Sequence, residues 1–346
     1  MAARTAPARV MIVEDSTVVR TLLTHIVGSD PRLTVAGSFA TAEDAIDALP
    51  ALRPDVISMD IRLPGIDGLE ATRRIMATQP TPIVVISASV DGGAMGNSMD
   101  ALRAGALSVV EKPVGLGDAA YAQVAHEIRT QLAIMSEVAV VRRRMSTAPR
   151  VPIQPPRQRP PSVLLVAAST GGPPALAKLL GALPADLPLP VLLVQHMGAS
   201  FMAGFASWLD SVVPQRVEIA RNGELPRPGM VHVAPGDAHL MLARAGTMRI
   251  ATDGPVGGQR PSATRLIESA ATALDGAALA VVLTGMGEDG AAGVQALLAA
   301  GGQAVAEDAS TSIVYGMPAA AHRAGALSLP LDLIAPHVRR IVERAR

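Results

Sequence analysis

Short runs of Val, Ile and Leu alternate with helix-like segments along most of this chain, and this alternation limits the fold more than any other feature. In the first part, the candidate strands are residues 9–13, 33–39, 55–60, 81–88 and 107–113. The helical segments between and after them are residues 16–29, 41–52, 67–79, 92–106 and about 118–144, the last with Asp118 as its expected N-cap. Such alternation predicts a parallel sheet covered by helices on both faces.

The alternation stops between Arg142 and Pro161 and then resumes. This stretch has six Arg, six Pro and no acidic residue, which favours an extended solvated linker over a basic docking segment. Further candidate strands are residues 162–169, 189–196, 216–221, 230–235, 247–252, 278–285 and 303–308. We therefore predict two doubly wound α/β domains, at residues 8–130 and 162–346, joined by a helix extension and linker at residues 131–161.

The composition narrows the class of protein. Apolar residues make up 49% of the 346-residue chain, enough for two cores, and Lys plus Arg equal Asp plus Glu at 30 each. A balanced charge gives nucleic-acid binding no electrostatic basis. The absence of cysteine excludes disulfides, thiolate catalysis and Cys-ligated metals. Only residues 10–13 run apolar before Glu14, and the longest uncharged run, residues 187–209, contains Pro188 and Pro190. We expect a cytoplasmic protein without membrane insertion.

Acidic residues follow two strands of the first domain. Glu14 and Asp15 come after the first strand and Asp60 after the third, so they should meet at one edge of a parallel sheet. Crowded carboxylates suit a hard cation such as Mg²⁺. A carboxylate beside Mg²⁺ can attack a phosphoryl group, while Lys112 neutralises charge on the transferred oxygens and Ser87 donates a hydrogen bond to them.

These residues make the first domain resemble the receiver domain of two-component response regulators, over about residues 8–130. The likeness rests on VEDS, MDIRLPGIDG, the Ser87-Ala88 pair and AGALSVVEKP. It implies a flavodoxin-like fold and phosphorylation of Asp60 by a histidine kinase. It also implies that Glu14, Asp15 and Asp60 hold Mg²⁺, and that Lys112 and Ser87 read the phosphate.

Three residues near strand ends of the second domain have the chemistry of a hydrolytic triad. Ser169 stands in AASTGG, His196 ends VLLVQH and Asp289 lies in LTGMGEDG. A serine becomes a good nucleophile when an imidazole removes its proton, and a carboxylate behind the imidazole fixes its tautomer. Backbone N–H groups of the glycine-rich TGMGEDG turn can bind an oxyanion.

Spacing alone leaves alternatives open for two of these roles. His232 and His239, in VHVAPGDAHL, compete with His196 as the base, and Glu288 competes with its neighbour Asp289 as the orienting acid. Each of these residues also has an ordinary structural explanation.

The second domain resembles the catalytic domain of the chemotaxis protein-glutamate methylesterase (CheB) family, over about residues 162–343. The shared motifs are ASTGG, QHM, HVAPGDAHL, RPS, LTGMGEDG and YGMP. The resemblance implies a Rossmann-like α/β fold with Ser169 as nucleophile, His196 as base, Asp289 as orienting acid and Met286 as a backbone oxyanion donor. The implied enzyme needs no cofactor for hydrolysis. It is activated by phosphorylation and removes methyl esters from glutamates on the cytoplasmic helices of chemoreceptors, and it also deamidates glutamines there.

The chain departs from these family patterns at three positions. Val109 stands where receivers usually carry Phe or Tyr, which argues against an aromatic relay. Glu288 and Thr264 stand where the esterase family commonly has Asn and Asp, so turnover, pH dependence or a domain or substrate contact can differ here.

Two other functions compete with an esterase. The second domain can be a non-catalytic adaptor for receptor or kinase, or VAASTGG can be the phosphate turn of a dinucleotide-binding oxidoreductase. The complete Ser/His/Asp set argues against an adaptor, and the lack of G-x-G-x-x-G argues against an oxidoreductase.

Overall fold

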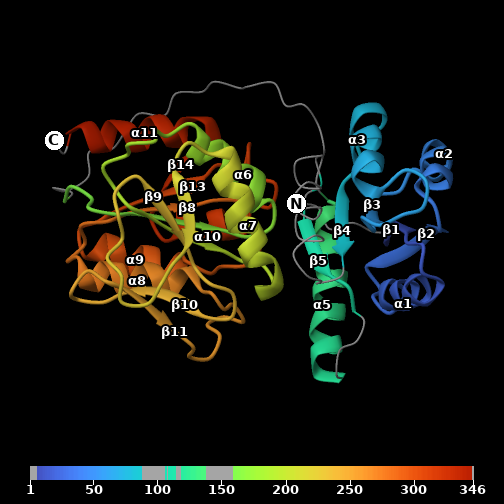
Figure 1. Cartoon of the computed structure of the whole chain (residues 1–346), viewed down its shortest axis with the longest axis horizontal. Helices are drawn as coiled ribbons and strands as arrows, with labels where there is room; N and C mark the ends of the chain where they lie inside the picture. Colours follow the sequence, from blue (N-terminus) through green and yellow to red (C-terminus); the bar gives the residue numbers. More distant parts are fainter. Residues whose placement is uncertain (1–5, 88–105, 107, 114–117, 138–158, 345–346) are drawn as a thin grey trace. The chain divides into compact units, whose positions relative to one another are not determined.

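The computed structural model describes residues 6–87, 106, 108–113, 118–137 and 159–344, which form two compact units (Figure 1). One unit lies within residues 1–147 and the other within residues 148–346. All of the predicted helix at residues 92–106 except Ala106, and most of the predicted linker, lie outside the described residues.

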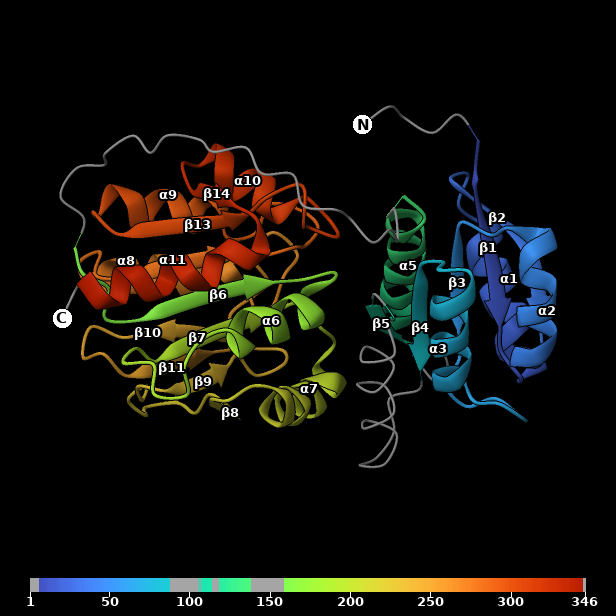
Figure 2. The same ribbon diagram turned by 90° about the horizontal axis from the view of Figure 1, so that it is seen from above.

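The first unit is a five-stranded parallel sheet with helices on both faces. Its strands are β1 (Ala8–Val13), β2 (Leu33–Phe39), β3 (Val56–Met59), β4 (Ile83–Ser87) and β5 (Ser108–Glu111), and its helices are α1 (Thr17–Gly28), α2 (Ala42–Leu52), α3 (Gly68–Thr78) and α5 (Asp118–Met135). The strand order β2-β1-β3-β4-β5 is flavodoxin-like, as predicted, and Figure 2 shows these strands side by side. Helices α1 and α5 pack on one face, and α2 and α3 on the other (Figure 1).

Local hydrogen bonds set most helix ends in this unit. The side chains of Ser16, Thr41 and Asp67 accept N–H bonds at the starts of α1, α2 and α3. The predicted helix from Asp118 to about Arg144 is shorter in the structure, because α5 ends at Met135 and is followed by a turn at residues 136 and 137. The rest of the predicted helix, residues 138–144, lies outside the described residues.

The second unit is built on a seven-stranded parallel sheet. Its strands are β6 (Leu164–Ala168), β7 (Val191–Gln195), β8 (Arg216–Ile219), β9 (Met230–Val233), β10 (His239–Leu242), β11 (Met248–Ala251), β12 (Leu279–Val282), β13 (Gln303–Glu307) and β14 (Leu327–Leu329), and its helices are α6 (Gly172–Gly181), α7 (Ala199–Val212), α8 (Ala263–Ala273), α9 (Ala291–Ala299), α10 (Met317–Arg323) and α11 (Leu331–Arg344). The sheet order is β14-β13-β12-β6-β7-β9-β8, and β10 and β11 form a separate antiparallel pair.

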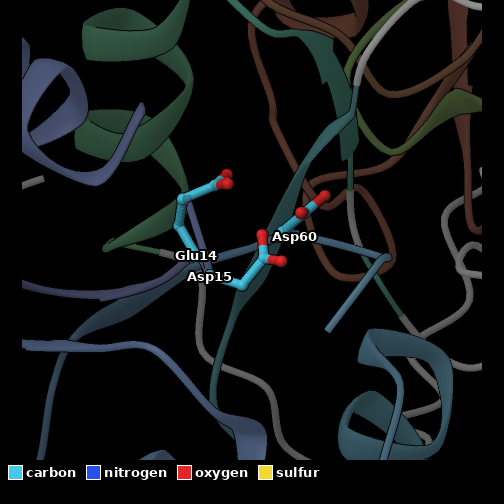
Figure 3. A group of neighbouring side chains, drawn as sticks. All are labelled: Glu14, Asp15 and Asp60. Carbon is cyan, nitrogen blue, oxygen red and sulfur yellow. The ribbon is translucent and has the colours of Figure 1, made fainter. Parts of the chain in front are cut away.

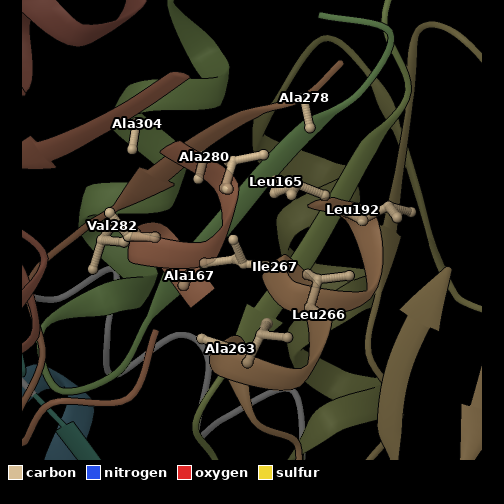
Figure 4. Packing of buried hydrophobic residues seen from close by; sticks show 14 of the residues in the cluster. Leu165, Ala167, Leu192, Ala263, Leu266, Ile267, Ala278, Ala280, Val282 and Ala304 are labelled. Atoms are coloured by element: carbon tan, nitrogen blue, oxygen red, sulfur yellow. The ribbon is translucent and has the colours of Figure 1, made fainter. Parts of the chain in front are cut away.

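The two faces of this sheet carry different helices. Helix α6 packs against α7 and α11, while α8 packs against α9 and α9 against α10 (Figure 1). On the α8 face, Ala263 and Ile267 of the helix lie over Leu165, Ala167 and other strand residues (Figure 4), and all of these side chains are buried. This packing fixes the start of α8 against the carboxyl end of the sheet.

Candidate active site and phospho-acceptor site

Strand pairing places Ser169 and His196 next to each other in the second unit. Ala168 and Gln195 are paired neighbours at the ends of β6 and β7, and each candidate is the following residue. The Gln195 side-chain amide donates to the carbonyl oxygens of both Ser169 and His196, each at 2.9 Å. One buried side chain therefore ties the nucleophile loop to the base loop.

The turn after Ser169 depends on glycine. Gly171 has a φ of 76° and precedes α6, and a Cβ there would collide with the Ile313 side chain. The helix begins directly afterwards with Pro173 in its first turn. The serine, which is half-buried, thus lies just before the N-terminus of a helix.

His196 is paired with Asp289. Its Nε2 atom lies 2.9 Å from Asp289 Oδ2, and both side chains are only 6% exposed. Because an ionised carboxylate only accepts hydrogen bonds, Nε2 carries the proton and Nδ1 has the free lone pair. Nδ1 is buried and has no hydrogen-bond partner among the described residues. It is therefore available as a proton acceptor on the ring edge that faces away from Asp289.

Asp289 is held ionised by the start of α8. Its carboxylate accepts hydrogen bonds from the Ser262 hydroxyl at 2.8 Å and from the N–H groups of Ala263 and Thr264 at 2.6 and 3.0 Å. Burial alone would raise the pKa of Asp289, but the bonds from His196 and from these two N–H groups hold the pKa well below its ordinary 3.8. These hydrogen bonds therefore favour the ionised form of the carboxylate.

The structure brings neither rival histidine to this carboxylate. His232 lies inside β9, where its Nε2 accepts the Arg227 N–H at 3.1 Å and burial lowers its pKa. His239 Nδ1 accepts the Ser262 N–H at 3.1 Å, and its Nε2 lies 3.1 Å from the Gly254 carbonyl oxygen. His239 therefore supports Ser262, which in turn bonds Asp289, and no spacing in the sequence indicates this link.

Glu288 and Thr264, which depart from the pattern of the esterase family, have different partners. Glu288 is 76% exposed and pairs with Arg323 at 2.9 Å, whereas Asp289 turns inward. The Thr264 side chain is buried and accepts the Gly290 N–H at 2.8 Å. Thr264 thus joins α8 to the loop that carries Asp289.

The TGMGEDG loop lies directly against the nucleophile. The Ser169 N–H donates to the Thr284 carbonyl at 3.0 Å, and a Cβ on Gly285 would come within 2.7 Å of Ser169 Cβ. The N–H of the next residue, Met286, donates no hydrogen bond within the described part of the chain. This free amide beside Ser169 has the chemistry of an oxyanion donor.

The acidic cluster of the first unit forms where the strand order reverses. Val13 of β1 pairs with Met59 of β3, so the residues that follow, Glu14 and Asp60, are neighbours. Carboxylate oxygens of these two residues and of Asp15 lie within 4.8 Å of one another (Figure 3). The crevice at such a reversal is where open parallel α/β sheets bind ligands.

Lys112 reaches both buried acids. Its Nζ atom lies 2.8 Å from Asp60 Oδ2 and 2.8 Å from Glu14 Oε2. Burial raises the pKa values of Glu14 and Asp60, and the hydrogen bonds from Lys112 offset this only partly. Ser87, at the end of β4, is buried next to this lysine, whose N–H donates to the Ser87 carbonyl at 2.9 Å. An additional cation would relieve the crowded negative charge, so these acids fit a divalent metal ion.

Comparison with known proteins agrees with both sites. The family model for the CheB methylesterase matches residues 164–338, and that for the response regulator receiver domain matches residues 10–121. The chain belongs to the CheB methylesterase family. Among its relatives is "Protein-glutamate methylesterase/protein-glutamine glutaminase 2" of Paramagnetospirillum magneticum, 49% identical over 96% of both chains. The relative named "Protein-glutamate methylesterase/protein-glutamine glutaminase" in Nitrosospira multiformis is 43% identical, again over 96% of both chains.

A solved structure shares the fold of the second unit. The CheB methylesterase catalytic domain of Thermotoga maritima covers 53% of this chain and 98% of its own, with 34% identity and a TM-score of 0.50. The predicted α/β architecture of this CheB-family chain, with a receiver and an esterase domain, is confirmed. Within the described residues, no helix is long and apolar enough to cross a membrane.

Proposed function

We propose that this protein is a phosphorylation-activated serine esterase that hydrolyses glutamate γ-methyl esters on chemoreceptors, releases methanol and also deamidates receptor glutamines. The observation that carries the proposal is the buried His196–Asp289 pair beside the strand end that holds Ser169. The names of the full-length relatives support the substrate class.

In the proposed reaction, His196 Nδ1 takes the proton from the Ser169 hydroxyl as Oγ attacks the ester carbonyl. Asp289 holds the ring in the Nε2-protonated tautomer and stabilises the imidazolium. The Met286 N–H donates to the oxyanion of the tetrahedral intermediate. His196 then returns the proton to the departing methoxide, and methanol leaves. Water, activated by the same imidazole, cleaves the acyl-enzyme and leaves a free glutamate.

Deamidation follows from the same geometry. With a glutamine side chain as substrate, His196 protonates the departing amine, and ammonia takes the place of methanol. The acyl-enzyme is identical in both reactions, so one site serves both.

The receiver unit supplies the control in this proposal. Asp60 is the phospho-acceptor, a histidine kinase is the donor, and Glu14 and Asp15 together with Asp60 would hold Mg²⁺. When bound, the metal ion supplies positive charge that neutralises the phosphoryl oxygens. Lys112 carries its own charge to the same place, because its bonds to Asp60 and Glu14 keep its pKa raised despite its burial. Ser87 would donate its hydroxyl to the phosphate. With a histidine kinase as donor and cytoplasmic receptor helices as substrate, the enzyme would act in the cytoplasm.

Removal of the receiver unit should raise the basal rate. The family resemblance implies that an unphosphorylated receiver covers the esterase site. A chain starting at Arg159 keeps the bonds of that residue to Gly301, Gln303 and Asp275. We expect faster methanol release from this fragment than from the unphosphorylated full chain. A fragment that is no faster, with unchanged Trp208 fluorescence, would contradict inhibition by the receiver.

The two neighbouring acids of the TGMGEDG loop should differ sharply in effect. Asp289→Asn keeps the size of the side chain but removes the charge that stabilises the imidazolium, so we expect kcat to fall by roughly 10³–10⁴. The matched change Glu288→Gln removes a charge from an exposed side chain paired with Arg323 and should alter kcat little. Steady-state methanol release from both variants tests the assignment, and equal losses would leave Asp289 without its special role.

A further inference from the structure

Glu307 is a buried carboxyl group that the proposed reaction does not use. It ends β13, and its side chain is completely inaccessible to solvent. Its Oε2 atom accepts the Thr284 N–H at 2.8 Å, whereas its Oε1 atom is buried without a hydrogen-bond partner among the described residues. The nearby Thr311 hydroxyl, which lowers the pKa of Glu307, donates to the Asp308 carbonyl and accepts the Leu331 N–H.

The residue that Glu307 holds is the centre of the active-site scaffold. The Thr284 carbonyl accepts the Ser169 N–H at 3.0 Å, and the Thr284 hydroxyl donates to the Thr170 carbonyl at 2.9 Å. The same hydroxyl oxygen accepts the Val314 N–H at 2.8 Å. Thr284 therefore joins the nucleophile loop, the oxyanion loop and the loop after β13. One residue, Thr284, therefore links the Glu307 carboxyl group to the nucleophile residue.

Few charges act on Glu307 from the elements around it. Lys178 of α6 lowers its pKa and the adjacent Asp308 raises it. Lys178 is itself paired with Asp332 of α11, and His322 of α10 bonds the Ala326 carbonyl. Helix α9 carries no charged residue. Burial is the dominant effect and raises the pKa of Glu307 from its ordinary 4.5 to about 7.

We propose that Glu307 is a positioning residue whose neutral carboxyl group holds the Thr284 peptide, and through it Ser169 and the oxyanion loop, in the arrangement that hydrolyses esters. Ionisation weakens this arrangement for two reasons. A charged oxygen without a donor must draw in water or move, which displaces Thr284. A negative charge on Glu307, which is linked to Ser169 through Thr284, also opposes the oxyanion that develops on the substrate. The inference rests on the proposed esterase function.

The pH dependence of kcat tests this role in the full-length, phosphorylated protein. We expect kcat of the wild type to decline as pH rises through about 7, with little change in KM for methylated receptor. Glu307→Gln keeps an oxygen acceptor for Thr284 but does not titrate, so the alkaline decline should disappear. Glu307→Leu removes the acceptor and should lower kcat at least tenfold at every pH. The matched Glu288→Gln variant should keep the wild-type profile.

Unfolding followed by fluorescence gives a second readout that does not require activity. Trp208 is the only tryptophan of the chain and is buried in α7, so it reports on the second unit. Because the pKa is raised on folding, the stability that comes from the bound proton is complete below pH 4.5 and is lost as pH rises to about 7. The unfolding midpoint of Glu307→Gln should therefore rise relative to that of the wild type as pH increases from 4.5 to about 7.

The outcomes separate the two claims. Identical pH profiles and a constant midpoint difference for wild type and Glu307→Gln would overturn the role of Glu307 while leaving the esterase intact. A wild type that releases no methanol at any pH would overturn the proposed function and the positioning role of Glu307 together.

Discussion

Replacement of Ser169 by alanine should lower the rate of methanol release from methylated receptors by roughly 10⁶, since the members of a triad act as a unit. Without the hydroxyl, His196 Nδ1 has no proton to take and no acyl-enzyme can form. Folding should not change, because the contacts of this loop with Gln195 and Thr284 use backbone atoms of residue 169. Steady-state methanol assays on the full-length variant, with Trp208 fluorescence as the folding control, measure the effect.

Covalent labelling tests the same assignment without a receptor substrate. A serine-directed fluorophosphonate should modify Ser169 in the wild type and in Ser310→Ala, a control at an exposed serine. Ser169→Ala should not be labelled. Labelling at another serine, or none in any variant, would favour a non-catalytic adaptor or another reaction. If replacement of His232 or His239 proved more damaging than that of His196, the base would be misassigned.

Replacement of Asp60 by asparagine should abolish incorporation of phosphate from a histidine kinase or from acetyl phosphate. Of the three clustered acids, only Asp60 both contacts the Lys112 ammonium group and follows β3, the central strand that pairs with β1. An amide cannot attack phosphorus as a carboxylate does. Radiolabelled phosphate retained on the purified protein is the measurement. The stimulation of esterase activity by a phosphodonor should disappear with it.

A matched change separates charge from chemistry in this experiment. Asp47→Asn alters an exposed carboxylate on α2 and should leave labelling at the wild-type level. Equal labelling of Asp60→Asn and wild type would mean that another residue accepts the phosphoryl group. The labelling rate of the wild type should rise as Mg²⁺ is added and should fall again when EDTA removes the ion.

The parts of the site that adjacent strands define could be predicted from the sequence. Ser169 and His196 each follow an apolar strand, and parallel strands with matched ends must bring them together. Glu14 and Asp60 are related in the same way. The choice between Asp289 and Glu288 could not be made, because both lie in a glycine-rich loop whose backbone path decides which side chain turns toward α8.

Other features depend on long-range packing that no local pattern records. The sequence predicts neither β10 nor β14, and the predicted strand β11 pairs antiparallel with β10 outside the main sheet. Glu307 ends an apolar strand and is followed by Asp308, so the sequence shows two acids at a loop start. Which of them is buried depends on how α9, α10 and α11 pack against β13.

The most direct test of the account is methanol release from receptors methylated with labelled methyl groups, measured with and without a phosphodonor. Wild type should release methanol slowly alone and faster with the phosphodonor. Asp60→Asn should keep only the slow rate, and Ser169→Ala should release none under either condition. If wild type and Asp60→Asn released methanol at the same rate with and without the phosphodonor, control by phosphorylation would be contradicted. Undiminished release by Ser169→Ala would contradict a serine esterase.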